Sequence, residues 1–125
     1  MKLFILLFLL PFTSFSQLEE EEIFDFCEVE PSFPGGSQAM MEFISMNVEY
    51  PAESMQKEEQ GVVYVQFVVG TTGELEQIVV RRGVSKLLDA EAVRVISKMP
   101  NWIPGEQNGK PIKVRFTLPI HFRLT

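Results

Sequence analysis

The side chains that most often perform chemistry in enzymes are scarce in this sequence of 125 residues. It holds one histidine, His121, and one cysteine, Cys27, and one of each cannot complete a metal site by themselves. Asp89 and Glu91 lie where a helix is predicted to start, and acidic side chains there interact favourably with the helix dipole. The glycine pair at 35–36 is not followed by the lysine and hydroxyl of a phosphate-binding loop. The sequence therefore predicts no enzyme activity, no cofactor and no metal.

The stretch from Lys110 to Leu124 indicates binding instead. Its even positions are apolar: Ile112, Val114, Phe116, Leu118, Ile120, Phe122 and Leu124. Its odd positions are mostly polar or basic: Lys113, Arg115, Thr117, Pro119, His121 and Arg123. Side chains alternate faces along a strand, so this pattern predicts a strand with one buried and one exposed, basic face. Pro119 lacks an N–H group and favours a sheet edge, where an unpaired strand can accept a partner.

The first sixteen residues have the pattern of a secretory signal peptide. Lys2 precedes the apolar run Leu3–Leu10, and the small residues Ser14 and Ser16 lie where a signal peptidase would read them, with cleavage expected before Gln17. The alternative is an uncleaved membrane anchor, but the run falls well short of the roughly 20 apolar residues that a spanning helix needs. We therefore expect a secreted mature chain without a membrane span.

Charge is divided unevenly along the chain. Residues 17–60 contain twelve acidic residues and one basic one, whereas residues 61–125 contain five acidic and nine basic ones. The formal net charge of −6 argues against nucleic acid as a partner. The basic half either attracts an acidic peptide or balances the acidic half. With Cys27 alone, an internal disulfide is impossible; a buried small hydrophobic residue, an intermolecular disulfide and a reactive thiol remain open for it.

The mature chain is predicted to be an acidic segment, 17–30, followed by one domain, 31–125. The segment includes a short strand or extended stretch at 23–29. In the domain we expect a helix from an N-cap at Ser37 to about Asn47, a second from Pro51 to about Gln60, strands at 62–69 and 75–82 with a bulge in the second, a helix at 86–99 and the final strand.

This order of elements predicts an α+β fold. It would contain a small three-stranded antiparallel sheet with helices packed on one face. Because consecutive strands usually pair, the final strand is expected to flank strand 62–69 and to leave its own outer edge free.

Several short motifs occur in an order and spacing that resembles the C-terminal domain of TonB. They are Phe33-Pro34-Gly35-Gly36, Tyr50-Pro51, Gly61-Val62-Val63, Phe67-Val68-Val69, Gly73, Leu88-Asp89, Glu91-Ala92, Pro100-Asn101-Trp102-Ile103-Pro104-Gly105, Asn108-Gly109-Lys110-Pro111 and Leu118-Pro119-Ile120-His121-Phe122. Each is weak alone, but together they cover 23–124, nearly the whole mature chain.

The resemblance implies a periplasmic binding module in TonB-dependent transmembrane transport. Members of the family couple an inner-membrane motor to outer-membrane transporters, and their C-terminal domain binds a transporter plug segment, the TonB box, as a strand added to its last strand. By position this strand is Lys113–Arg123. The implied partner-binding residues are Lys113, Arg115, Thr117, His121 and Arg123, with Asn47 at the polar contact position three residues before Tyr50.

The sequence departs from a full transducer, because it shows neither a spanning helix for the motor nor a long proline-rich rod. We therefore expect a free-standing form of the domain. Three interpretations stay open. The edge binds a transporter plug peptide; or the protein is a non-transducing envelope scaffold that forms a homodimer or pairs with another envelope protein through the same edge; or Ile23–Val29 covers the edge and regulates access.

Overall fold

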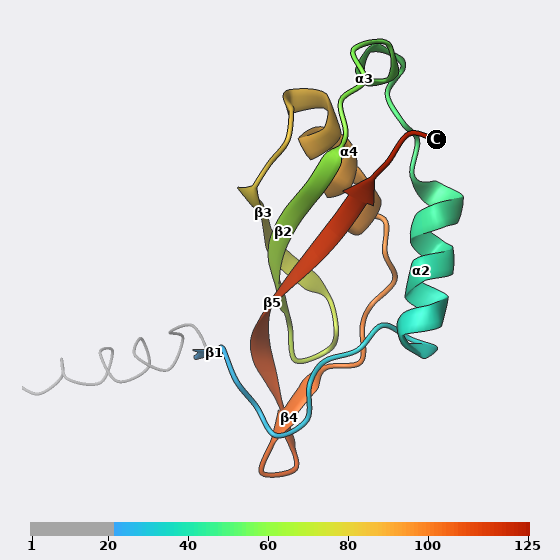
Figure 1. Cartoon of the computed structure of the whole chain (residues 1–125). Coiled ribbons are helices and arrows are strands. Elements are labelled where there is room, and N and C mark those ends of the chain that lie inside the picture. Colours follow the sequence, from blue (N-terminus) through green and yellow to red (C-terminus); the bar gives the residue numbers. More distant parts are fainter. Residues whose placement is uncertain (1–21) are drawn as a thin grey trace, which may run out of the picture.

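The structure is a computed structural model that describes residues 22–125 (Figure 1). The predicted signal peptide, residues 1–16, lies outside the described residues, as does the first part of the predicted acidic segment, residues 17–21.

The described chain contains three helices and five strands. In chain order they are β1 (Ile23–Phe24), α2 (Gly36–Asn47), α3 (Ala52–Gln56), β2 (Gly61–Val69), β3 (Leu75–Arg82), α4 (Lys86–Ser97), β4 (Gly105–Gln107) and β5 (Lys110–Phe122). The predicted α+β class is confirmed, but the sheet has five strands where three were predicted. Of the two additional strands, β1 lies within residues 23–29, where a short strand or extended stretch was predicted. β4 was not predicted, because three residues are too few for an alternating pattern to be recognised.

The strands are ordered β1-β5-β2-β3, and β4 also pairs with β5. β5 is antiparallel to β2 from the pair Val69–Val114 to the pair Gly61–Phe122, without a break in register. The expectation that the final strand flanks the first strand of the hairpin is therefore confirmed. β3 carries the predicted bulge: its register with β2 shifts between Gln66 and Val68, and Gln77 has a positive φ of 52°.

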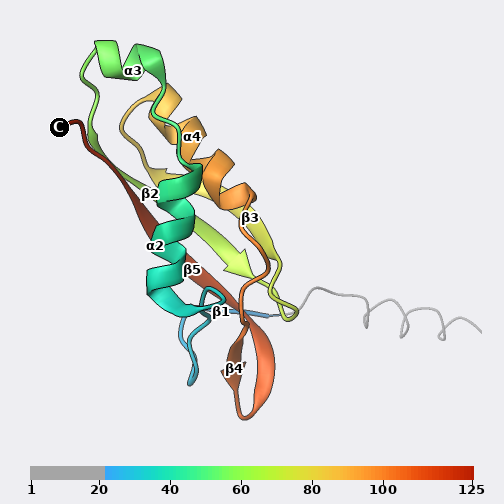
Figure 2. The ribbon, with the colours of Figure 1, turned by 90° about the vertical axis from the view of Figure 1, so that its right-hand side faces the viewer.

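The helices α2 and α4 lie on the same face of the sheet and leave the other face open (Figure 2). α4 forms as predicted because its apolar residues fall on one side, and Leu88, Ala92 and Ile96 are buried in one cluster with Val65 and Phe67 of β2. α2 packs more loosely and has no fully buried residue. The sheet thus has a covered face, which holds the core, and an open face.

The two predicted N-terminal helices differ in detail from expectation. The N-cap of α2 is Gly35, in the left-handed conformation with φ 92° and no side-chain cap, so the prediction of Ser37 was wrong. α3 ends at Gln56 rather than Gln60. The chain leaves the helix there because Glu58 has a positive φ of 57°, which a continuing α-helix does not allow.

Trp102 joins the loop after α4 to the core. Its ring lies 5.3 Å from that of Phe67 and 5.2 Å from that of Phe116, measured between centroids, and it also contacts Phe33 edge to face. Its backbone N–H donates to the carbonyl of Gly73 in the β2–β3 turn, at 2.8 Å. The segment that leads into β4 and β5 is thereby fixed against the hairpin.

Candidate functional site

The alternation predicted for the last strand is observed in β5. Val114, Leu118, Ile120 and Phe122 are buried on the covered face of the sheet. The intervening residues lie on the open face, and most are exposed from Thr117 onward. The strand therefore joins the core on one side while its other side faces solvent.

The expectation that the final strand leaves its outer edge free holds only in part, because two short strands of the same chain cover the beginning of β5. β4 pairs with Lys110–Ile112, and β1 runs parallel to β5 with partners at Lys113 and Val114. Beyond these, no residue of the described range 22–125 pairs with the outer side of β5 at residues 116–122. We call this stretch the free edge.

Pro119 reveals which backbone groups point toward the free edge. In an antiparallel ladder, pairs that exchange two hydrogen bonds alternate with pairs that exchange none. Pro119 has no N–H to exchange, so its pair with Tyr64 is of the second kind. In the unbroken register, residues 117, 119 and 121 therefore direct their backbone groups away from β2. The free edge offers the N–H groups of Thr117 and His121, and the carbonyl groups of Thr117, Pro119 and His121.

The predicted contact residues of the last strand follow one another along β5 and just past its end: Lys113, Arg115, Thr117, His121 and Arg123. Two of them already have partners within the chain. Lys113 Nζ lies 3.4 Å from Glu76 Oε1, and Arg115 Nη1 lies 2.5 Å from Asp25 Oδ1, just after β1. For Arg123, which is exposed, the structure shows no ion pair with a carboxylate within residues 22–125.

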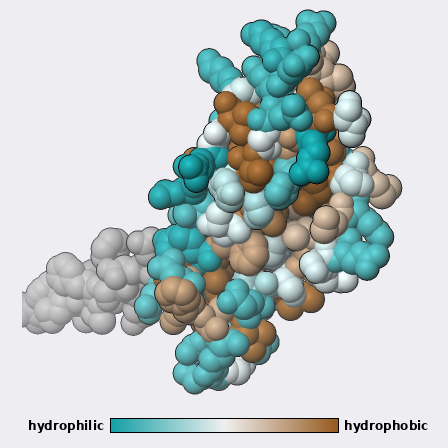
Figure 3. Space-filling view, viewed as in Figure 1, coloured by the Kyte–Doolittle hydropathy of each residue, from teal (hydrophilic) through white to brown (hydrophobic). Residues whose placement is uncertain are grey.

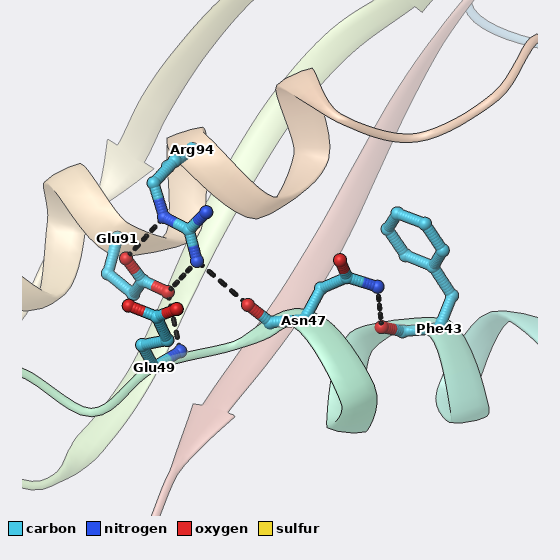
Figure 4. A network of polar contacts seen from close by, with 5 residues as sticks. All are labelled: Phe43, Asn47, Glu49, Glu91 and Arg94. Atoms are coloured by element: carbon cyan, nitrogen blue, oxygen red, sulfur yellow. Dashed lines mark hydrogen bonds and ion pairs between the residues drawn. The ribbon is translucent and has the colours of Figure 1, made fainter.

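Asn47 does not lie on β5 but is the last residue of α2, where it takes part in a network that joins α2 to α4 (Figure 4). Its side-chain amide donates to the carbonyl of Phe43 at 2.8 Å. Its own carbonyl accepts from Arg94 Nη2 at 2.7 Å. Through these contacts Asn47 connects the end of α2 to α4. The binding role that the resemblance implies for Asn47 stays a prediction.

Glu91 is the centre of this network and was not foreseen as more than an acidic residue near a helix start. It is 9% exposed. Its carboxylate accepts from Arg94 Nε and Nη2, at 2.8 and 2.7 Å, and from the Glu49 N–H at 2.6 Å. Arg94 lowers the pKa of Glu91 most, burial opposes this effect, and the Glu49 N–H adds to the lowering. A sequence signal existed: Glu91 and Arg94 have the i,i+3 spacing of a helical ion pair.

Cys27 is half-buried, and its Sγ donates to the carbonyl of Val29 at 3.1 Å. Burial, and secondarily the charge of Glu30, raises the pKa of the thiol. A raised pKa lowers the thiolate fraction, so among the three interpretations of Cys27 the structure favours the reactive thiol least.

The fold defines a small α+β domain with a mostly antiparallel sheet, helices on one face and a partly unpaired edge on its long last strand. The family described as Gram-negative bacterial TonB protein C-terminal matches residues 46–124. The match spans more than half of the sequence, so this chain belongs to that family.

Two solved structures share the fold, both NMR solution structures of the TonB C-terminal domain of Helicobacter pylori. The one of residues 194–285 has 22% sequence identity and a TM-score of 0.52, and the match covers 68% of this chain and 89% of that chain. The one of residues 179–285 has 24% identity and a TM-score of 0.54, covering 74% and 87%. No curated protein sequence matches the chain. Within residues 22–125, no helix has the length and apolar character needed to cross a membrane.

Proposed function

We propose that this protein is a periplasmic binding module of TonB-dependent transmembrane transport. It takes an extended plug segment of an outer-membrane transporter, the TonB box, as a strand added to the free edge of β5. Membership of the TonB C-terminal family supports the kind of partner. The observation that carries the mode of binding is the free edge itself, because unpaired backbone groups on a long strand are what an added strand requires.

The backbone groups of the free edge set the expected affinity. Residues 117–121 supply about five hydrogen bonds, each worth about 0.5–1.5 kcal/mol net. Ordering the peptide and restricting its motion cost several kcal/mol. Backbone pairing alone therefore falls short of micromolar affinity, which requires about −8 kcal/mol. Tighter binding needs contacts from side chains.

Two substitutions with opposite expected effects test the docking mode. Pro119→Thr adds an N–H group that points to the free edge, so it should tighten binding of a synthetic TonB-box peptide by about two- to tenfold. Thr117→Pro removes such a group and should weaken binding by a similar factor. Neither change removes a hydrogen bond to β2, since both residues face away from it. Isothermal titration calorimetry measures both affinities.

Unfolding curves of the two variants control for damage to the fold. Amide chemical-shift changes on adding the peptide to the labelled wild-type protein should centre on residues 115–123 and their neighbours. The docking mode is contradicted if both variants bind as the wild type does, or if the shifts lie elsewhere on the domain.

The pairing of β1 with β5 favours a regulatory addition to this function. β1 and the ion pair between Asp25 and Arg115 shorten the edge that a partner can use. Deleting residues 17–30 should expose the backbone of Lys113 and release Arg115, which would raise peptide affinity by about two- to tenfold. Unchanged affinity in the same calorimetric titration, with an intact unfolding transition, would show that β1 does not limit access.

Self-association through the same edge is the alternative function. Copies paired symmetrically about Pro119 would lack both central hydrogen bonds, since neither proline can donate. This absence weighs against a tight homodimer. Concentration-dependent dimerisation in analytical ultracentrifugation that is lost on Arg115→Pro, with a folded monomer remaining, would favour the alternative.

A further inference from the structure

A hollow of about 480 Å³ lies between α2 and the free edge of β5. Its lining is largely apolar and comes from two elements. These residues are Met40, Met41, Ile44 and Ser45 of α2, Val48 directly after it, and Leu118, Pro119, Ile120 and His121 of β5. Figure 3 shows hydrophobic residues, coloured brown, between the strand and the helix. We call this hollow the α2–β5 groove.

The groove is continuous with the free edge. Alternate side chains of a strand point to opposite faces of a sheet. A strand added to residues 117–121 would therefore direct every second side chain to the covered face, next to Leu118 and Ile120. Directly opposite side chains on neighbouring strands have Cβ atoms about 5 Å apart. The side chains on that face of an added strand therefore enter the α2–β5 groove.

We propose that the α2–β5 groove is a specificity pocket for the added strand, and that it takes two large apolar side chains at alternate positions, i and i+2. This inference rests on the proposed function and adds the side-chain chemistry of the partner. Methionine suits such a role because its unbranched, polarisable side chain adapts to different apolar shapes. Met41 is 66% exposed and can close over a bound side chain.

The side chains on the opposite face of the partner strand are expected to be acidic. They would lie along the open face near His121 and Arg123. Residues 110–125 contain four lysine or arginine residues and no acidic one, in a chain whose formal net charge is −6. Lys113 and Arg115 are already paired within the chain, so Arg123 is the cation near the groove that shows no ion pair within residues 22–125. Opposite charges facing each other across neighbouring strands are favourable. The occupant is therefore an extended segment of another protein, apolar on one face and acidic on the other.

A second copy of this chain fits the same surface less well. If the β5 strand of a second copy paired symmetrically about Pro119, Arg115 of each copy would lie opposite Arg123 of the other. Like charges facing each other across strands are destabilising. The apolar residues of that second β5 are moreover already buried in its own core, so they are not available to fill the groove.

Pro119 explains why apolar side chains of the partner strand contribute to binding at the α2–β5 groove. It lines the groove, and it is the one position on residues 117–121 where the edge lacks a donor. The backbone of an added strand is thus held least at the level of the groove. Side chains buried in the groove hold the strand there and make binding depend on sequence, which backbone pairing alone does not do.

Two synthetic twelve-residue peptides of identical composition test the inference. Both contain two leucines, two aspartates and otherwise serine and threonine. In one peptide the leucines are at positions 6 and 8, so both can face the groove. In the other they are at positions 6 and 7, so only one can. Burying the second leucine should make the alternate peptide bind about ten- to hundredfold more tightly, as measured by calorimetry.

A matched pair of protein variants tests the residues of the groove. Met41→Glu places a charge in the lining and should weaken the alternate peptide at least tenfold and remove the difference between the two peptides. Met46→Glu is the control, because Met46 is an exposed methionine of the same helix, at 83%, but does not line the groove. Its affinities should stay within about twofold of wild type.

Each remaining outcome is decisive. Equal affinities of the two peptides for the wild type would refute the proposal that the α2–β5 groove is a specificity pocket. If the Met41→Glu variant binds the peptides as the wild type does while Thr117→Pro weakens their binding, strand addition is supported and the groove is not a specificity pocket. If neither peptide binds, the pocket is refuted, and the proposed function is refuted as well only if the TonB-box peptide also leaves the amide signals along β5 unshifted. A wild-type dimer that Met41→Glu dissociates in ultracentrifugation assigns the groove to a second copy and overturns the partner proposed here.

Discussion

Replacing Gly73 with alanine should cost more than about 3 kcal/mol of the free energy of unfolding, enough to threaten a domain of ordinary stability. A Cβ at this position would lie 1.9 Å from the carbonyl oxygen of Trp102 and 3.0 Å from its carbonyl carbon. Both are backbone atoms, which cannot rotate away. The φ of Gly73 is also +94°, which is unfavourable for any residue with a Cβ. A urea denaturation curve measures the loss.

Gly109→Ala is the matched control for this substitution. Gly109 also has a positive φ, +75°, but no heavy atom lies within 4 Å of the place its Cβ would occupy. The cost of Gly109→Ala is therefore only that of holding an alanine at a positive φ, about 1 kcal/mol of the free energy of unfolding. Equal losses for the two variants would show that the contact between the β2–β3 turn and Trp102 does not limit stability.

The second large effect is expected at Glu91. Glu91→Ala should lower the free energy of unfolding by about 2–3 kcal/mol, because it removes hydrogen bonds to a charged acceptor and leaves the Glu49 N–H without its partner. Glu42→Ala, on the exposed side of α2, should change it by less than about 0.5 kcal/mol. Chemical denaturation of both variants at neutral pH gives the comparison.

The contribution of Glu91 should also depend on pH in one direction. Its pKa in the folded protein is lowered, so the folded state binds fewer protons at this site than the unfolded state. The stabilisation is fully present above the unfolded-state pKa and is lost as the pH falls through the folded-state pKa. The difference in stability between the wild type and Glu91→Gln should be constant near pH 7 and shrink below about pH 4. A difference that grows on acidification would refute this assignment.

The parts of the fold that the sequence predicted well are those with a long repeating pattern. The alternation over thirteen residues of β5 and the one-sided apolar face of α4 are each sustained over several periods, so chance matches are few. The bulge in β3, near Gln77, was also predicted, because a break in alternation marks such a place.

Short or long-range features were missed for a physical reason. β4 is held by three ladder pairs, which local sequence does not encode. β1 was not missed in the same way, because a short strand within residues 23–29 was predicted and its cover of the edge was one of the open interpretations. The helix that supplies Met40, Met41 and Ile44 was predicted, but none of them was predicted to line a groove. The groove arises from how α2 lies against β5, and that arrangement depends on contacts between residues far apart in the chain. The residue roles predicted along Lys113–Arg123 and at Asn47 stay predictions.

The missing donor at Pro119 has a consequence for solubility. Fibrils grow when each new chain meets a complete row of backbone partners on the chain before it. In this protein the row on β5 lacks the donor of Pro119, and Arg115 and Arg123 lie four positions away on either side. We therefore expect the protein without a bound partner to stay soluble at high concentration, because its free edge is a poor starting point for fibril growth.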